Sequence, residues 1–282
     1  MFVFVILHYK NIVDTIKCLE SIKKIDNQEK IRIVVVDNHT LDETDIRKIE
    51  KYTKDIVLLD DNLGFAKANN IGCKYAIENY NPDFMAVINS DTEICQSNFI
   101  NMIYEIDNKY HYDVLGPKIL PDELDSCNPF PAYTTLNEVE DRIVYTKRLI
   151  KIYKNPFLRY LLKIYTSRRK KKVPLTNGKE ISWNVPLHGC ALVFSKKYYE
   201  KYSDVFYNKT FLFHEEEFLY QRCVRDRLLF LYNPELEIIH KEGQSLNMKF
   251  KNDEYRKLLF RNTEILKSLE LLKEVMKNNK EV

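Results

Sequence analysis

Several features that define common protein classes are missing from this chain of 282 residues. No apolar run approaches about 18 residues, so no helix is expected to cross a membrane. The apolar residues 1–7 lack a basic flank and a small-residue cleavage site, which favours a first buried strand over a signal peptide. No G-x-G-x-x-G follows an early strand, and this argues against a dehydrogenase.

Cysteine spacing and net charge argue against three further classes: disulfide-bonded proteins, zinc proteins and general nucleic-acid binders. The six cysteines have no C-x-x-C spacing, and several lie inside apolar segments. This pattern favours reduced, mostly structural thiols in a cytoplasmic protein over a disulfide framework or a zinc site. The net charge of +3 is too small to indicate nucleic-acid binding over the whole surface.

Residues 1–120 alternate between strand and helix signals. Apolar runs typical of buried strands occur near residues 2–8, 31–36, 56–59 and 84–88. Helices are expected between them, near residues 11–24, 42–53 and 65–79. Strands joined in this way pair in parallel, so we expect an α/β fold with a doubly wound, mostly parallel sheet. Polar residues follow each strand, and parallel pairing gathers them at one edge as a binding site.

The second half of the chain is less regular. We expect residues 121–180 to be rich in loops, followed by a buried strand at 187–194. Two further strands are expected near 228–232 and 236–240, and a C-terminal helix from about 253 to 277. Residues 121–245 are therefore interpreted as the second half of one domain, and 246–282 as a C-terminal helix.

Polar motifs stand at the ends of these predicted elements. Asn89–Asp91 follows a buried strand, where a carboxylate can hold a divalent cation against phosphate groups. Asn62–Phe65 joins a strand to a helix, and Gly64 permits a tight turn there. Glu215–Glu217 opens a later helix, and repulsion between its charges raises the proton affinity of at least one carboxylate, which suits a general base. Each motif alone also fits an ordinary turn or helix cap, so only their combination is informative.

The order and spacing of these motifs resemble glycosyltransferase family 2, the inverting nucleotide-sugar transferases of the GT-A fold. The matching segments are Ile6–Tyr9, Val34–Asn38, Asn62–Asn70, Ile88–Asp91, His188–Ala191, Phe213–Glu216 and His240–Ser245. The pattern is most similar to the bacterial branch of rhamnosyl- and galactosyltransferases that build surface polysaccharides. The resemblance implies a GT-A-like, Rossmann-like and mostly parallel central sheet flanked by helices.

The resemblance also implies a donor site for a UDP- or dTDP-linked sugar. Its residues would be His8, Tyr9, Asp37, Asn38, Asn62, Gly64, Phe65, Asn69, Asn89, Ser90 and Asp91. Asp37 would bind the nucleotide base, and Asp91 would bind Mn²⁺ or Mg²⁺ between the two phosphates, with His240 as a second ligand. Asn89 replaces the first carboxylate of the family's DXD motif; its amide can coordinate a cation but supplies no charge.

On the acceptor side, the family's base motif falls on Glu215 and Glu216. We expect Glu216 to be the general base, with Glu215 as the alternative, and His188 and Gly189 to bind the acceptor. The base would take a proton from an acceptor hydroxyl, which displaces the nucleoside diphosphate in one inverting step. The resemblance implies a glycan or lipid-linked acceptor, in capsule or O-antigen synthesis.

Residues 147–172 are rich in Lys and Arg, contain no acidic residue, and are interleaved with apolar and aromatic residues. This composition indicates a segment that lies on anionic lipid, although a solvated loop is the alternative. We therefore expect a cytoplasmic enzyme that is peripheral on the inner face of the plasma membrane and does not bind nucleic acid.

Two other functions stay open from the sequence alone. A nucleotidyltransferase also uses a parallel sheet and paired carboxylates, but residues 8–11 lack the Gly-rich loop that it needs after its first strand. The amide of Asn89 also permits a catalytically silent subunit that binds nucleotide sugars or acts as a scaffold. Turnover of a nucleotide-sugar donor distinguishes the enzyme from the silent subunit.

Overall fold

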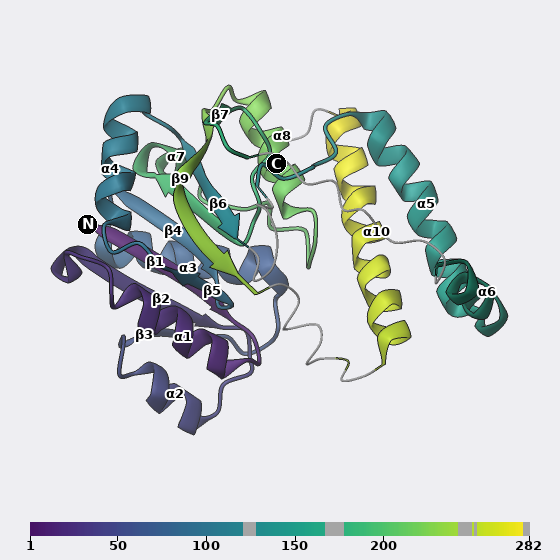
Figure 1. Ribbon diagram of the computed structural model, residues 1–282, viewed down its shortest axis with the longest axis horizontal. Coiled ribbons are helices and arrows are strands. Elements are labelled where there is room, and N and C mark those ends of the chain that lie inside the picture. The colour runs from purple at the N-terminus through teal and green to yellow at the C-terminus, as the bar shows by residue number, and fades with distance from the viewer. Residues whose placement is uncertain (121–127, 167–177, 242–249, 251–252, 279–282) are drawn as a thin grey trace.

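In the described part of the chain, nine strands form one central sheet with helices on both faces (Figure 1). A computed structural model describes all residues except 121–127, 167–177, 242–249, 251–252 and 279–282. The strands are β1 (Phe2–His8), β2 (Ile31–Asp37), β3 (Asp55–Leu58), β4 (Phe84–Asn89), β5 (Thr92–Ile94), β6 (Val114–Leu120), β7 (Ser182–Trp183), β8 (Ala191–Ser195) and β9 (Phe230–His240). The helices are α1 (Ile12–Ile22), α2 (Glu43–Ile49), α3 (Gly64–Tyr80), α4 (Phe99–Tyr110), α5 (Leu136–Lys154), α6 (Pro156–Thr166), α7 (Lys196–Lys201), α8 (Glu215–Arg225) and α10 (Glu254–Asn278).

The sheet is parallel in its N-terminal half and mixed beyond it. The strand order is β3-β2-β1-β4-β8-β6-β9-β5, with β7 paired to β9. β1 pairs in parallel with β2 and β4, and β2 with β3, as their helical connections require. β8 lies antiparallel between β4 and β6. The predicted α/β fold is confirmed, but the two strands expected near 228–232 and 236–240 are one strand, β9.

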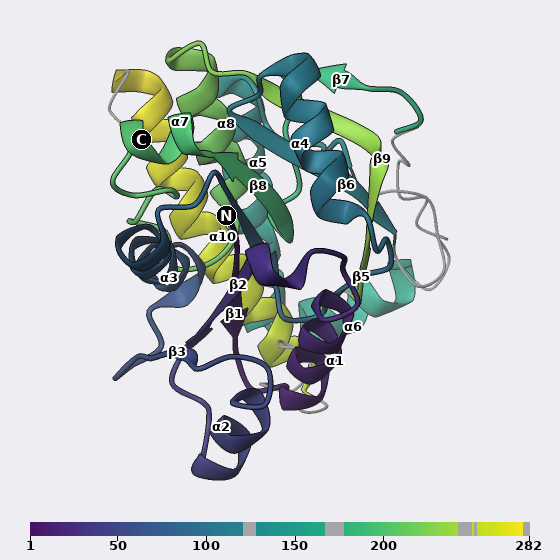
Figure 2. The same ribbon diagram turned by 90° about the vertical axis from the view of Figure 1, so that its left-hand side faces the viewer.

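Successive side chains of a buried strand point to opposite faces of the sheet, and this divides the core into two layers. Phe2, Phe4 and Ile6 of β1 pack with α1, α2 and α4, whereas Val3 and Val5 pack with α3, α7 and α8. Figure 2 shows these two helix layers on either side of the strands. The direction of the side chains repeats every two residues along a strand, so a sheet that is covered on both faces has two such layers. Because both faces are buried, the register of β1, β2 and β4 is fixed and their carboxyl ends meet at one edge.

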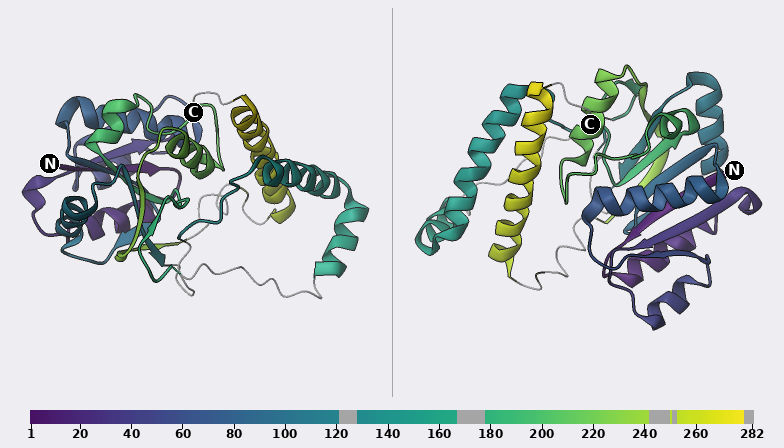
Figure 3. Two further views of the ribbon diagram at one scale, coloured as in Figure 1. Left: turned by 90° about the horizontal axis from the view of Figure 1, so that it is seen from above. Right: turned by 180° about the vertical axis from the view of Figure 1, so that it is seen from behind.

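Helices α5, α6 and α10 form a helical arm beside the sheet (Figures 1 and 3). α5 and α10 lie side by side, and Ile143 of α5 and Leu269 of α10 share a small core with Phe218 of α8. The ion pair between Lys273 and Glu140, at 3.0 Å, also joins the two helices. The arm is thus anchored to α8, the helix that carries the acidic motif.

The prediction that residues 121–180 are rich in loops is wrong for residues 136–166, which form α5 and α6. Val139 and Ile143 are four residues apart and mark one face of α5, but the residues that bury this face lie on α10, far away in the sequence. A helix stabilised by such distant packing gives only a weak local signal. Among the described helices, none is both long and apolar enough to span a bilayer.

Candidate active site

A cavity of about 180 Å³ lies at the carboxyl ends of β1, β2 and β4. Eight of the predicted donor residues line it: Tyr9, Asn38, Asn62, Gly64, Phe65, Asn89, Ser90 and Asp91. The edge of a parallel sheet places them together because each follows, or lies close to, the end of a strand. The predicted location of a binding site therefore coincides with a cavity.

The turn before α3 is built by hydrogen bonds from asparagine side chains. Oδ1 of Asn38 accepts from the backbone N–H of Leu63 at 2.9 Å, and Oδ1 of Asn62 accepts from that of Gly64 at 3.0 Å. Gly64 has a φ of 81°. The next amide, that of Phe65, donates to the carbonyl of Phe211 at 2.8 Å, so this turn is joined to the chain segment before α8.

Three predicted donor residues do not line the cavity. His8 is buried, its Nδ1 lies 2.7 Å from Oγ1 of Thr15, and burial lowers its pKa. Both carboxylate oxygens of Asp37 accept from the backbone N–H of Thr40, at 2.9 and 3.1 Å. Asn69 is buried within α3 and donates to a carbonyl one turn earlier. These side chains instead hold the strand ends and α3 in place.

Aromatic residues that the sequence analysis did not assign complete the cavity wall. Phe211 and Phe213 precede α8, and Phe260 comes from α10. Phe213 and His214 have φ angles of 73° and 69°, a conformation that costs non-glycine residues about 1–3 kcal/mol each. The Phe211–Phe213 run is visible in the sequence, but nothing in it indicates a place in the cavity wall, and no sequence signal places Phe260 beside it.

Asp91 meets His240 beside this cavity. Oδ1 of Asp91 lies 3.2 Å from Nε2 of His240. The contact follows from antiparallel pairing of β5 with β9, in which Thr92 stands opposite His240. Burial lowers the pKa of His240, but the Cys190 thiolate and the Asp91 carboxylate outweigh it and raise that pKa to about 11. The two predicted metal ligands are therefore adjacent.

The three carboxylates at the start of α8 have different environments. Oε1 of Glu216 accepts from the backbone N–H of Gly189 at 3.1 Å, and this side chain is only partly buried. Glu217 is buried, and its Oε1 lies 3.0 Å from Nδ1 of His214. Glu215 is also buried, and burial together with the charge of Glu216 raises its pKa to about 8. Of the three, only Glu216 is partly exposed to solvent.

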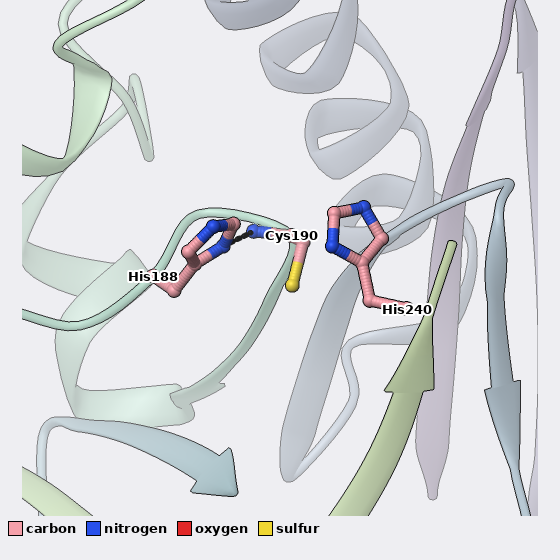
Figure 4. Close-up of side chains that lie close together, drawn as sticks. All are labelled: His188, Cys190 and His240. Atoms are coloured by element: carbon pink, nitrogen blue, oxygen red, sulfur yellow. Dashed lines mark hydrogen bonds between the residues drawn. The ribbon is translucent and has the colours of Figure 1, made fainter. Parts of the chain in front are cut away.

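His188, Cys190 and His240 lie close together (Figure 4). One ligand atom from each residue lies within 4.8 Å of the others. Burial alone raises the pKa of the Cys190 thiol, but the neighbouring imidazoles lower it to about 7. Because Gly189 contacts Glu216 and His240 contacts Asp91, the cluster links the predicted general base to the predicted metal ligand.

The sequence motifs also identify a family. The model of glycosyl transferase family 2 matches residues 4–202, which is more than half of the chain. The chain belongs to this family. It is therefore a glycosyltransferase, and the family predicted from the motifs is confirmed. The matched range includes Asn89–Asp91 and His188 but ends before Glu216 and His240, so the positions of these last two rest on the structure.

Solved structures of S. aureus TarS share the fold of this glycosyltransferase. TarS 1-349 matches with a TM-score of 0.56 and 13% identity, covering 92% of this chain and 69% of that one. Its complex with UDP matches with a TM-score of 0.56 and 13% identity, over 93% and 70% of the two chains. Its complex with UDP-GlcNAc matches with a TM-score of 0.53 and 16% identity, over 99% and 72%. No curated protein sequence matches the chain.

We expect G64A to destabilise the glycosyltransferase and to weaken donor binding. A Cβ atom at Gly64 would lie 2.2 Å from the carbonyl oxygen of Phe211, and alanine disfavours a φ of 81°. The loss should be about 1–3 kcal/mol of unfolding free energy. Urea unfolding followed by circular dichroism measures it, and a variant as stable as the wild type would show that the turn does not need glycine.

Proposed function

We propose that this glycosyltransferase moves a sugar from a UDP- or dTDP-linked donor to an acceptor hydroxyl, with inversion. The observation that carries the proposal is the cavity at the strand ends, with Asp91 in its wall and Glu216 on the same side of the protein. The crystallised complexes of TarS with UDP and with UDP-GlcNAc support a nucleotide-sugar donor. We further propose the rhamnosyl- and galactosyltransferase branch, whose motifs the sequence resembles.

Glu216 would act as the general base. It stands at the N-terminus of α8 beside Gly189, next to the predicted acceptor residue His188. Its carboxylate would take the proton of the acceptor hydroxyl as that oxygen attacks the anomeric carbon and the bond to the nucleoside diphosphate breaks. Glu215 suits this role less well, because it is buried, and burial together with the charge of Glu216 raises its pKa and favours the protonated form.

Asp91 and His240 would hold a divalent cation, Mn²⁺ or Mg²⁺, at the donor diphosphate. The 3.2 Å between Oδ1 of Asp91 and Nε2 of His240 fits two neighbouring ligands of one ion, since octahedral bonds of about 2.1 Å place adjacent ligands about 3 Å apart. When bound, the cation would stabilise the charge that develops on the leaving diphosphate. Asn89 adds an amide oxygen to the same edge, and Gly64 and Phe65 shape the facing wall.

A panel of nucleotide sugars tests the donor proposal. In the presence of Mn²⁺, one UDP- or dTDP-linked sugar should raise the melting temperature of the full chain by several °C, because a ligand at about 100 times its Kd adds about 2.7 kcal/mol of stability. The same donor should release its nucleoside diphosphate with an acceptor. If no donor stabilises the protein, the donor site is wrongly placed, and binding without turnover would support a silent subunit.

The acceptor proposal is a glycan or lipid-linked hydroxyl in surface polysaccharide synthesis, reached by an enzyme peripheral on the inner face of the plasma membrane. Helix α6 carries its exposed apolar residues at positions i, i+3 and i+4: Phe157 (67% exposed), Tyr160 (63%) and Leu161 (46%). Arg159 lies in the same helix, and the predicted basic segment continues to residue 172, although 167–172 lie outside the described residues. An apolar face beside basic residues suits an anionic membrane surface.

We expect the double substitution F157S/Y160S to release the protein from vesicles of phosphatidylcholine and phosphatidylglycerol. Burying such side chains is worth about 1.5–3 kcal/mol each, so the partition coefficient should fall by at least tenfold. Co-sedimentation at constant ionic strength measures the bound fraction. V224S removes an apolar side chain that is 54% exposed on α8, outside helices α5, α6 and α10, and should bind like the wild type. If both variants bind equally well, α6 is not a membrane surface.

A further inference from the structure

The cluster of His188, Cys190 and His240 has the donor set of a transition-metal site. One ligand atom of each residue lies within 4.8 Å of the others, and Cys190 and His240 are 1% and 6% exposed. The cluster joins the loop before β8 to the end of β9, so two separate parts of the sheet hold it. Two imidazoles and one thiolate are a borderline-soft donor set, which selects Zn²⁺ over Mg²⁺ or Mn²⁺.

The orientation of His240 points independently to a ligand. Its Nδ1 is buried and has no nitrogen or oxygen partner among the described residues, so the Cys190 side chain is its polar neighbour. Figure 4 shows a ring nitrogen of His240 facing Cys190. The other ring nitrogen, Nε2, is held 3.2 Å from Oδ1 of Asp91. A histidine that ligates a metal commonly has its second nitrogen fixed by a carboxylate in this way. A neutral thiol is a weak hydrogen-bond partner, so a bound cation would satisfy this buried ring nitrogen better.

We propose that His188, Cys190 and His240 bind one Zn²⁺ ion, with Nδ1 of His240 and Sγ of Cys190 among its ligands. Zinc bonds of about 2.0–2.3 Å place tetrahedral ligand atoms about 3.3–3.6 Å apart. The three ligand atoms lie within 4.8 Å of one another, so side-chain rotations that move each atom by about 1 Å would bring them to these separations. The ligand atoms must be free of protons, so zinc binding releases to solvent the proton on Nδ1 of His240 and any proton that remains on the Cys190 sulfur. Three protein ligands leave one coordination position open.

The zinc site shares His240 with the cation proposed at the donor diphosphate, and a neutral imidazole ligates only one ion. With Zn²⁺ on Nδ1, Nε2 of His240 keeps its proton and donates to Asp91, so the donor-site cation would then be held by Asp91 without His240. The oxygen-rich donor edge suits Mn²⁺ or Mg²⁺, and the thiolate suits Zn²⁺. Zinc binding therefore does not depend on the proposed transfer reaction, and it can be measured without a donor.

A titration with Co²⁺ alone tests the proposal, because Co²⁺ takes zinc sites and shows a thiolate-to-metal charge-transfer band. The full chain is used with C95S and C127S, which remove an exposed cysteine and one outside the described residues. We expect one equivalent of Co²⁺ to bind with that band, and Zn²⁺ to displace it. C190S should lose the band. Loss of a residue that only orients a metal ligand costs about 10–100-fold in affinity, so H240A, which removes a ligand itself, should weaken Co²⁺ binding by more than that.

The matched control is C223S, which alters a buried cysteine outside the cluster and should leave the titration unchanged. Circular dichroism checks that each variant is folded. The wild-type spectrum is decisive even if a variant fails to fold: absence of the charge-transfer band from the folded protein overturns the proposal. The same conclusion follows if C190S or H240A binds Co²⁺ as tightly as the parent protein, with the band retained.

Discussion

Replacing Glu216 with glutamine is expected to abolish sugar transfer while donor binding stays nearly unchanged. Glutamine keeps the size of the side chain and can still accept the hydrogen bond from Gly189, but it cannot take a proton from the acceptor. Loss of a positioned general base lowers the rate by about 10²–10⁴-fold. The measurement pairs a steady-state transfer assay with a calorimetric titration of the donor.

E215Q is the matched control for this variant, because it makes the same chemical change one residue earlier. Burial and the charge of Glu216 raise the pKa of Glu215, which favours the protonated, neutral form of its carboxyl group. Replacing it with a neutral amide should change the rate at pH 7 little. If E215Q loses most of its transfer activity while E216Q stays active, Glu215 is the general base and Glu216 is not.

The N-terminal half of the fold could be predicted because its signals are local. Residues 31–36 are β-branched and apolar with a single interruption at Arg32, which indicates a strand buried on both faces, and β2 is such a strand. Helical connections then require parallel pairing, and parallel pairing places the polar residues after each strand at one edge. Asn38, Asn62 and Asp91 could therefore be assigned to a common cavity without any knowledge of distances.

The remaining parts of the fold depend on partners far away in the sequence. β8 lies antiparallel between β4 and β6, and nothing in residues 191–195 indicates either its neighbours or its direction. α5 is stabilised by contacts with α10, which begins about 100 residues later. Local patterns specify whether a segment is buried, but they do not specify what covers it.

The same limit applies to the site. Spacing rules search for cysteines close together, so they missed Cys190, whose neighbour His240 is supplied by a different strand. Asp37 stands where the family motif places it, yet its carboxylate holds the backbone of Thr40, a use that only coordinates reveal. Phe260 lines the cavity from the C-terminal helix, where no motif indicates a role. Sequence motifs located one edge of the cavity and missed the wall that closes it.

Removal of the Asp91 carboxylate should abolish the contribution of Mn²⁺ to donor binding. Asp91 is the acidic residue in the cavity wall, and Asn89 beside it supplies no charge. With an asparagine in place of Asp91, the edge keeps its shape and hydrogen-bonding capacity but loses the charge that attracts a divalent cation. We expect D91N to lower donor affinity at least about tenfold in the presence of Mn²⁺. Titrations of the nucleotide donor with Mn²⁺ and with a chelator measure this effect.

E93Q provides the control, because Glu93 lies two residues further on β5 and pairs with Lys241 outside the cavity wall. This variant should respond to Mn²⁺ like the wild type. With a chelator present, D91N and the wild type should bind the donor equally weakly, which separates loss of the cation from damage to the nucleotide pocket. If Mn²⁺ improves donor binding equally in D91N and the wild type, the cation is held elsewhere. If D91N binds less donor even with the chelator, Asp91 contributes to the pocket directly.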